Sequence, residues 1–182
     1  MTIEYLATPR TPTRLPRRAI IAVVVAVVLV AGLFVWWTDA VRREANETLA
    51  AALQDTSQGA KAGQARVLST LAYSYPMIWS TSVPDGVRTG LREVVESSAG
   101  EVAADLRRVR ADVAAVRVLP WQADQQVAQR EVLALIDAHL ARFDRMSADA
   151  ASIGPVMSET DPSDASARES LRASGAGEPP KR

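Results

Sequence analysis

The sequence predicts an all-α fold with one N-terminal transmembrane helix, an extracytoplasmic antiparallel bundle of about three long helices, and a disordered C-terminal tail. Three observations predict it. An uncharged apolar run of 19 residues lies near the N-terminus. Apolar residues then recur at spacings of three and four over most of the remaining chain. The composition is alanine-rich and only 5% aromatic, which favours a thin core built by close helix approach.

The apolar run spans residues 19–37 and reads AIIAVVVAVVLVAGLFVWW. As a helix it is roughly 28 Å long, close to the hydrocarbon thickness of about 30 Å. Its valines favour a strand in water, but an isolated strand in lipid leaves its backbone groups unpaired. Arg17 and Arg18 flank one end, and Trp36 and Trp37 close the other, as is typical of residues at a membrane interface. We therefore expect an uncleaved signal-anchor helix in the lipid bilayer.

The charges around this run predict its orientation. Residues 1–18 form a short basic tail with four arginines against Glu4 alone, while the charges just after the run cancel. This asymmetry predicts a cytoplasmic N-terminus and an extracytoplasmic remainder in the cell membrane. From Thr38 onward, 17 of the 21 basic and 20 of the 21 acidic residues remain, so we expect no nucleic-acid partner.

A cleaved secretion signal is the alternative for this run, because residues 38–40 resemble a small-x-small cleavage site. The run is longer than the about 7 to 15 apolar residues of a signal core, and bulky tryptophans precede the site, so an anchor is favoured. Ala22 and Ala26 have the spacing with which two membrane helices pair in a homo-oligomer. In an alanine-rich chain this spacing also arises by chance.

Prolines divide residues 38–155 into three expected helices, at about 38–75, 85–119 and 122–151. Each carries one stripe at alternating spacings of three and four, which predicts left-handed coiled-coil packing. Gly59 and Gly63 weaken the first stripe, so we expect a kink or fray at residues 57–64. The stripes are Asn46, Leu49, Leu53, Ser57, Ala60, Gln64, Val67, Leu71 and Tyr75; Val87, Leu91, Val95, Ser98, Val102, Leu106, Val109, Val113 and Val116; and Gln125, Ala128, Val132, Leu135, His139, Phe143 and Met146.

Residues 156–182 are rich in serine, proline, glycine and mixed charge, with very few large apolar side chains. A segment of this composition buries too little apolar surface to fold alone. We therefore expect a disordered tail.

Little in the chain points to catalysis or metal binding. There is no cysteine, which excludes disulfides and thiol chemistry, and the single histidine, His139, excludes a histidine-rich metal site. No nucleophile elbow or phosphate loop is present. We expect no enzyme activity, no cofactor and no metal. His139 lies within an apolar stripe, which favours a hydrogen-bonded residue at the edge of the core over a pH sensor or metal ligand. Residues 46–48 match a glycosylation acceptor, a pattern that is common by chance.

The strongest candidate binding site is the sequence around the first break between helices. Large side chains gather there around a proline, namely Tyr73, Tyr75, Met77, Ile78 and Trp79. They either cap a thin bundle or form a partner-binding tip. Trp121, at the second break, is expected to return to the membrane surface as a further interface anchor.

The arginine bias, 19 arginines against two lysines, is typical of a high-GC genome, and we expect an actinobacterial source. The layout favours a non-enzymatic accessory subunit of a cell-envelope assembly, with other envelope proteins as partners. The alternative is a ligand-sensing helical domain that signals through a partner protein, because 18 cytoplasmic residues hold no output domain.

Overall fold

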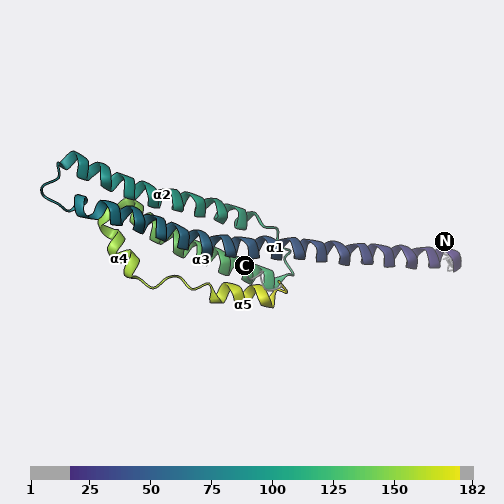
Figure 1. The fold of residues 1–182 in the computed structure, drawn as a ribbon. Coiled ribbons are helices and arrows are strands. Elements are labelled where there is room, and N and C mark those ends of the chain that lie inside the picture. Colours follow the sequence, from purple (N-terminus) through teal and green to yellow (C-terminus); the bar gives the residue numbers. More distant parts are fainter. Residues whose placement is uncertain (1–16, 177–182) are drawn as a thin grey trace, which may run out of the picture. The chain divides into compact units, whose positions relative to one another are not determined.

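A computed structural model describes the backbone of residues 17–176 and the side chains of residues 21–176 (Figure 1). Within that range the chain is 85% helical and has no strands, which confirms the all-α prediction. The helices are α1 Arg17–Ile78, α2 Asp85–Ala115, α3 Ala123–Ala148, the 3-10 turn η1 Ala150–Ser152, α4 Ile153–Ser158 and α5 Ala165–Ala173. The chain divides into two compact units, Met1–Ala40 and Val41–Arg182.

The described part of the first unit is the amino-terminal part of α1. Its apolar side chains from Ile21 to Trp36 are exposed, and α1 is a candidate membrane span by length and composition. The helix continues without a break to Ile78, so the separate helices expected at 19–37 and 38–75 are one element. The fray expected at residues 57–64 is wrong, since α1 stays helical across both glycines (Figure 1).

In the second unit, α2 runs antiparallel to α1, and α3 antiparallel to α2. Arg92 of α2 lies over Trp79 just beyond α1, whereas Glu101 pairs with Arg66, nearer the start of α1. Between α2 and α3, Arg107 pairs with Asp144 and Arg110 pairs with Asp137. The residue numbers rise along α2 as they fall along α3, so these two helices are also antiparallel. These pairs are exposed to solvent, where ion pairs contribute little, so packing supplies most of the stability.

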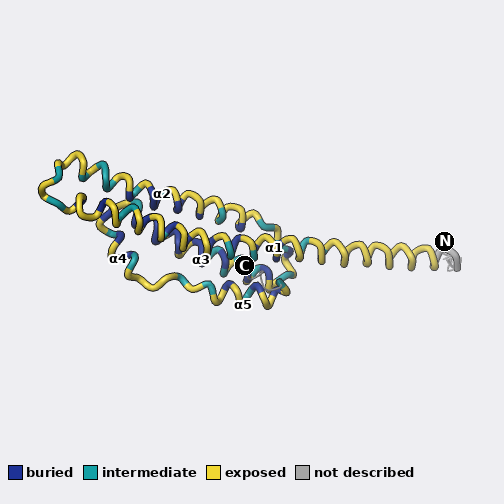
Figure 2. Tube along the Cα trace, viewed as in Figure 1, coloured by how far each residue is buried: buried dark blue, intermediate teal, exposed yellow. Residues whose placement is uncertain are grey.

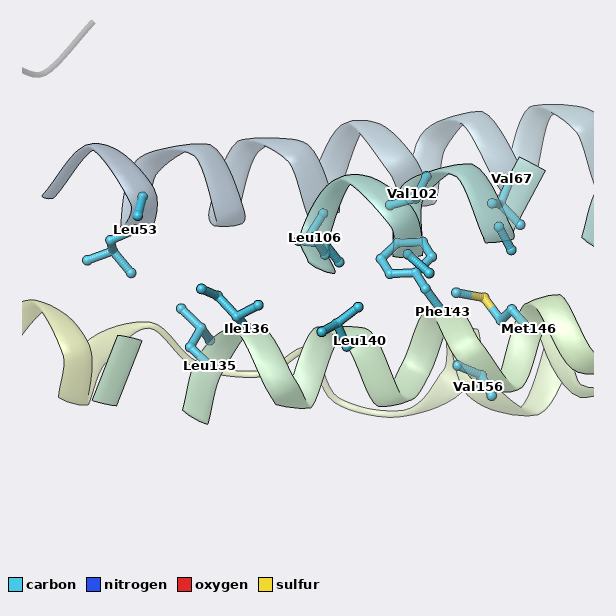
Figure 3. Close-up of a cluster of buried hydrophobic side chains, with 14 of the residues drawn as sticks. Leu53, Val67, Val102, Leu106, Leu135, Ile136, Leu140, Phe143, Met146 and Val156 are labelled. Atoms are coloured by element: carbon cyan, nitrogen blue, oxygen red, sulfur yellow. The ribbon is translucent and has the colours of Figure 1, made fainter. Parts of the chain in front are cut away.

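The core follows the predicted stripes closely. Figure 2 shows that the buried residues line the inward faces of the helices in this unit. Figure 3 shows aliphatic side chains of α1 and α2 meeting the apolar face of α3, with Phe143 as the one aromatic ring drawn. The large buried side chains of this core include Leu49, Leu53, Val67, Val95, Val102, Leu106, Val113, Val132, Ile136, Phe143 and Met146. The first stripe ends on the buried Ser74 and Ile78 rather than on Tyr75, which is exposed.

Both predicted helix breaks occur, but their bounds differ. Pro76 lies inside the last turn of α1 rather than ending it. α2 ends at Ala115 and α3 begins at Ala123, so their connection is longer than expected. The side chain of Gln129 donates to the Val113 and Val116 carbonyls at 2.8 and 3.1 Å, and so adds hydrogen bonds to carbonyls where α2 ends.

The prediction of a disordered tail over residues 156–182 is wrong for its described part. Residues Ala165–Ala173 form α5, whose Ala167 and Leu171 belong to the hydrophobic core. Gly175 follows with φ +86°, and the Ala176 amide donates to the Leu171 carbonyl. This is the Schellman arrangement that ends helices at a glycine. Residues 177–182 lie outside the described range.

Candidate functional site

The aromatic tip lies where α1 ends and turns into α2. Leu68 and Tyr75 lie seven residues apart, hence on one exposed face of α1, and the exposed Trp79 directly follows the end of the helix. The Tyr75 and Trp79 rings meet edge to face with centroids 6.4 Å apart. The Arg92 guanidinium lies 5.3 Å from the Trp79 ring centroid, within cation–π range. We call these four residues the aromatic tip.

The five candidate partner-binding residues do not form one surface. Ile78 is only 1% exposed and belongs to the core, so its assignment as a contact residue is wrong. Tyr73 and Met77 are exposed but lie about half a helix turn from Tyr75 and Trp79. Leu68 and Arg92, which sequence reasoning missed, complete the tip. The spacing of Leu68 to Tyr75 was a visible signal, whereas Arg92 reaches the tip only through the antiparallel pairing of α2.

The residues expected at a membrane interface are exposed wherever their side chains are described. Trp36 and Trp121 are 68% and 59% exposed, and Trp37 lies 6.2 Å from Phe34, ring centroid to ring centroid. The side chains of Arg17 and Arg18 lie outside the described residues. Trp121 follows α2 at the opposite end from the aromatic tip (Figure 1).

A cluster of polar groups surrounds Arg142 of α3. The Arg142 side chain is only 5% exposed. Its guanidinium pairs with Asp161 and donates to the Val156 and Glu159 carbonyls at 3.0 and 3.4 Å. Gln64 of α1 also donates to Asp161, at 2.7 Å. These hydrogen bonds hold the pKa of the Asp161 carboxyl below its ordinary value, so it stays charged at neutral pH. The cluster fastens the segment after α4 onto α1 and α3.

His139 lies one turn before Arg142 and is 6% exposed. Its Nδ1 has no hydrogen-bond partner among the described residues, contrary to the expected hydrogen-bonded role. Burial lowers its pKa, and so does the positive charge of Arg142, while Asp161 and Asp164 act in the opposite direction. The ring is therefore neutral at pH 7.

The carboxyl end of α5 is held by polar side chains of α1 and α3. The Ser174 carbonyl accepts from Arg42 Nη2 at 2.6 Å and from Asn46 Nδ2 at 3.2 Å, and the Ser174 hydroxyl donates to Asn46 Oδ1 at 3.0 Å. Gln125 of α3 donates to the same carbonyl. Asn46 of the glycosylation pattern is thus buried and occupied, which argues against modification there.

A trough of about 260 Å³ lies between α1 and α2. Gly59, Ala62 and Gly63 form one wall, and Val102, Leu106 and Val109 are among the residues of the other. The remaining lining residues are Asp55, Arg66 and Asp105.

No group of three or more histidine, cysteine, aspartate or glutamate residues with metal-binding geometry occurs among the described residues. Comparisons with protein-family models, curated proteins and solved structures find no match for this chain.

Proposed function

We propose that this chain is a single-pass membrane protein whose helical unit is an extracytoplasmic, non-enzymatic interaction domain of a cell-envelope assembly. The exposed apolar side chains from Ile21 to Trp36 support insertion into a bilayer, because water does not tolerate so large an apolar surface. The arginine excess before them supports a cytoplasmic N-terminus.

The observation that carries the interaction role is the exposure of the aromatic tip. The second unit has five aromatic residues in Val41–Ala176, and only Phe143 is buried. Rings that merely capped the bundle would be covered by it, yet Tyr75 and Trp79 are both exposed. Clustered aromatic and arginine side chains are typical of the residues that dominate protein–protein binding energies. The partner proposed here is therefore another envelope protein with an apolar surface.

Site-specific photocrosslinking in intact cells tests the tip. A photoreactive phenylalanine analogue at Tyr75 is expected to give one discrete adduct, and the same analogue at Ser97, exposed on α2, is expected to give none. Trp79→Ala in the Tyr75-labelled chain is expected to weaken the adduct at least several-fold. Equal adducts at both positions, or no effect of Trp79→Ala, would refute binding through the tip.

Cysteine labelling tests the membrane topology separately. The chain has no cysteine, so a cysteine introduced at the exposed Ser163 or at Thr11 is the only thiol that can be labelled. With any outer barrier permeabilised, a membrane-impermeant maleimide is expected to label position 163 and to leave position 11 unlabelled. The reverse pattern would overturn both the orientation and the localisation.

Ligand sensing is the second candidate function, and the trough between α1 and α2 is the observation that favours it. Alanine, valine and leucine side chains in its lining suit a small apolar ligand. A Cβ at Gly59 meets no atom within 4 Å, so a larger side chain can start there without a clash, and Gly59→Leu is chosen to occupy the trough. A small apolar compound that raises the melting temperature of the wild type but not of Gly59→Leu would support sensing. Equal effects on both would contradict it.

A further inference from the structure

The C-terminal strap, residues 159–176, crosses α1 and α3 with little apolar burial of its own. Its buried members are Ala167, Leu171 and Ser174. Polar contacts supply the rest of its attachment. Asp161 pairs with Arg142, Asp164 Oδ2 accepts from Ser57 at 3.2 Å, and Glu159 pairs with Arg145 at 2.6 Å. A segment held by few apolar contacts opens at a lower free energy than the core beneath it.

His139 is buried where this strap is fastened. Its Nδ1 is unpartnered, so a proton added there finds no acceptor in the closed arrangement. The charged groups around it come from every element that packs nearby. Arg142 lies on α3, Asp161 and Asp164 lie on the strap before α5, Arg168 of α5 pairs with Asp164, and Lys61 of α1 also acts on Asp164.

We propose that the C-terminal strap is an acid-releasable cover, in which protonation of His139 detaches α5 from α1 and α3. Release exposes the apolar surface beneath Ala167 and Leu171 and frees the polar ends of Asn46 and Gln125. The strap then acts as an internal ligand that occupies this surface at neutral pH and vacates it in acid. This device is independent of binding at the aromatic tip.

The sign of the effect follows from the environment of the ring. The closed state disfavours the proton, because burial and Arg142 lower the pKa of His139 below its ordinary value of about 6.5. The closed strap is therefore fully favoured above pH 6.5 and loses stability as the pH falls below it. The strap carboxylates titrate lower, since Arg142, Arg145 and Arg168 hold the pKa values of Asp161, Glu159 and Asp164 below their ordinary range. His139 is thus the group that responds first.

Single-cysteine accessibility in the full chain in lipid nanodiscs tests the proposal. Ala167→Cys places the only thiol beneath α5, and Glu169→Cys places it on the exposed face of the same helix. A dithiodipyridine reagent, which reacts with thiols in mild acid, is applied at pH 7.5 and pH 5.0. The ratio of the labelling rate of Ala167→Cys to that of Glu169→Cys is expected to rise several-fold when the pH is lowered from 7.5 to 5.0. An open-state pKa of about 6.5 sets a ceiling of about 30-fold.

Two controls keep the result specific to His139. His139→Gln and His139→Met remove the titrating ring, and the rate ratio is expected to be flat with pH in both. Ala99→Cys, which replaces a fully buried residue of α2, is expected to stay unreactive at both pH values. A flat ratio in the parent chain, a rise that persists in both histidine variants, or a parallel rise at Ala99→Cys would each overturn the proposal.

Discussion

Two glycines in the middle of α1 allow a matched test of how closely α1 and α2 approach. A Cβ built on Gly63 lies 2.6 and 2.9 Å from the two γ-methyls of Val102 and 3.3 Å from Phe143 Cζ. A Cβ on Gly59, one turn earlier, meets nothing within 4 Å. Both substitutions to alanine gain up to about 1 kcal/mol of helix propensity. Only Gly63→Ala adds the overpacking cost of about 1 to 3 kcal/mol, because a β-branched valine in a helix has little rotamer freedom to move aside.

We therefore expect Gly59→Ala to stabilise the helical unit by up to about 1 kcal/mol and Gly63→Ala to leave it unchanged or destabilise it by up to about 2 kcal/mol. Chemical unfolding of the full chain in detergent, followed by circular dichroism, measures both. Adding Val102→Ala removes the two methyls that clash and should make Gly63→Ala favourable in that background. Equal stabilisation by the two glycine substitutions would refute the close approach of α1 and α2.

Two further predictions concern α3 and the connection before it. Arg142→Ala removes a nearly buried guanidinium with three partners and is expected to destabilise the unit by about 2 kcal/mol. Arg145→Ala removes a half-exposed ion pair and is expected to cost clearly less. Urea unfolding compares the two variants, and equal losses would contradict the fastening role of Arg142. Trp121 is expected to be quenched by headgroup-brominated lipids more strongly than Trp79, measured in variants that retain only one of these two tryptophans and have phenylalanine at positions 36 and 37. Stronger quenching of Trp79 would exclude the proposed bundle orientation.

The sequence predicted the helices of the second unit well because packing there follows one simple rule. Stripes of alanine and aliphatic residues at spacings of three and four predicted Val95, Val102, Leu106, Val132 and other buried residues correctly. Helix bounds were less predictable. Pro76 was taken as a break, yet α1 continues past it, because a proline in the last turn removes only one helical hydrogen bond. Gly59 and Gly63 were expected to weaken the helix. At Gly63, however, the missing side chain leaves the space that the Val102 methyl groups occupy.

The strap escaped prediction because its stability resides in residues far away in the chain. Composition alone says that two buried side chains, Ala167 and Leu171, cannot offset the ordering of the segment. Further attachment comes from Ser174, whose carbonyl and hydroxyl form hydrogen bonds with Asn46, a residue 128 positions away in the chain. A local signal was present nonetheless. A basic last turn followed by a glycine is typical of the end of a helix, and here Gly175 adopts a positive φ. Such a helix-ending pattern is not expected in a disordered tail. A helix-stop signal in a segment too polar to fold alone therefore indicates a helix that folds against other parts of the protein, which in this chain are α1 and α3.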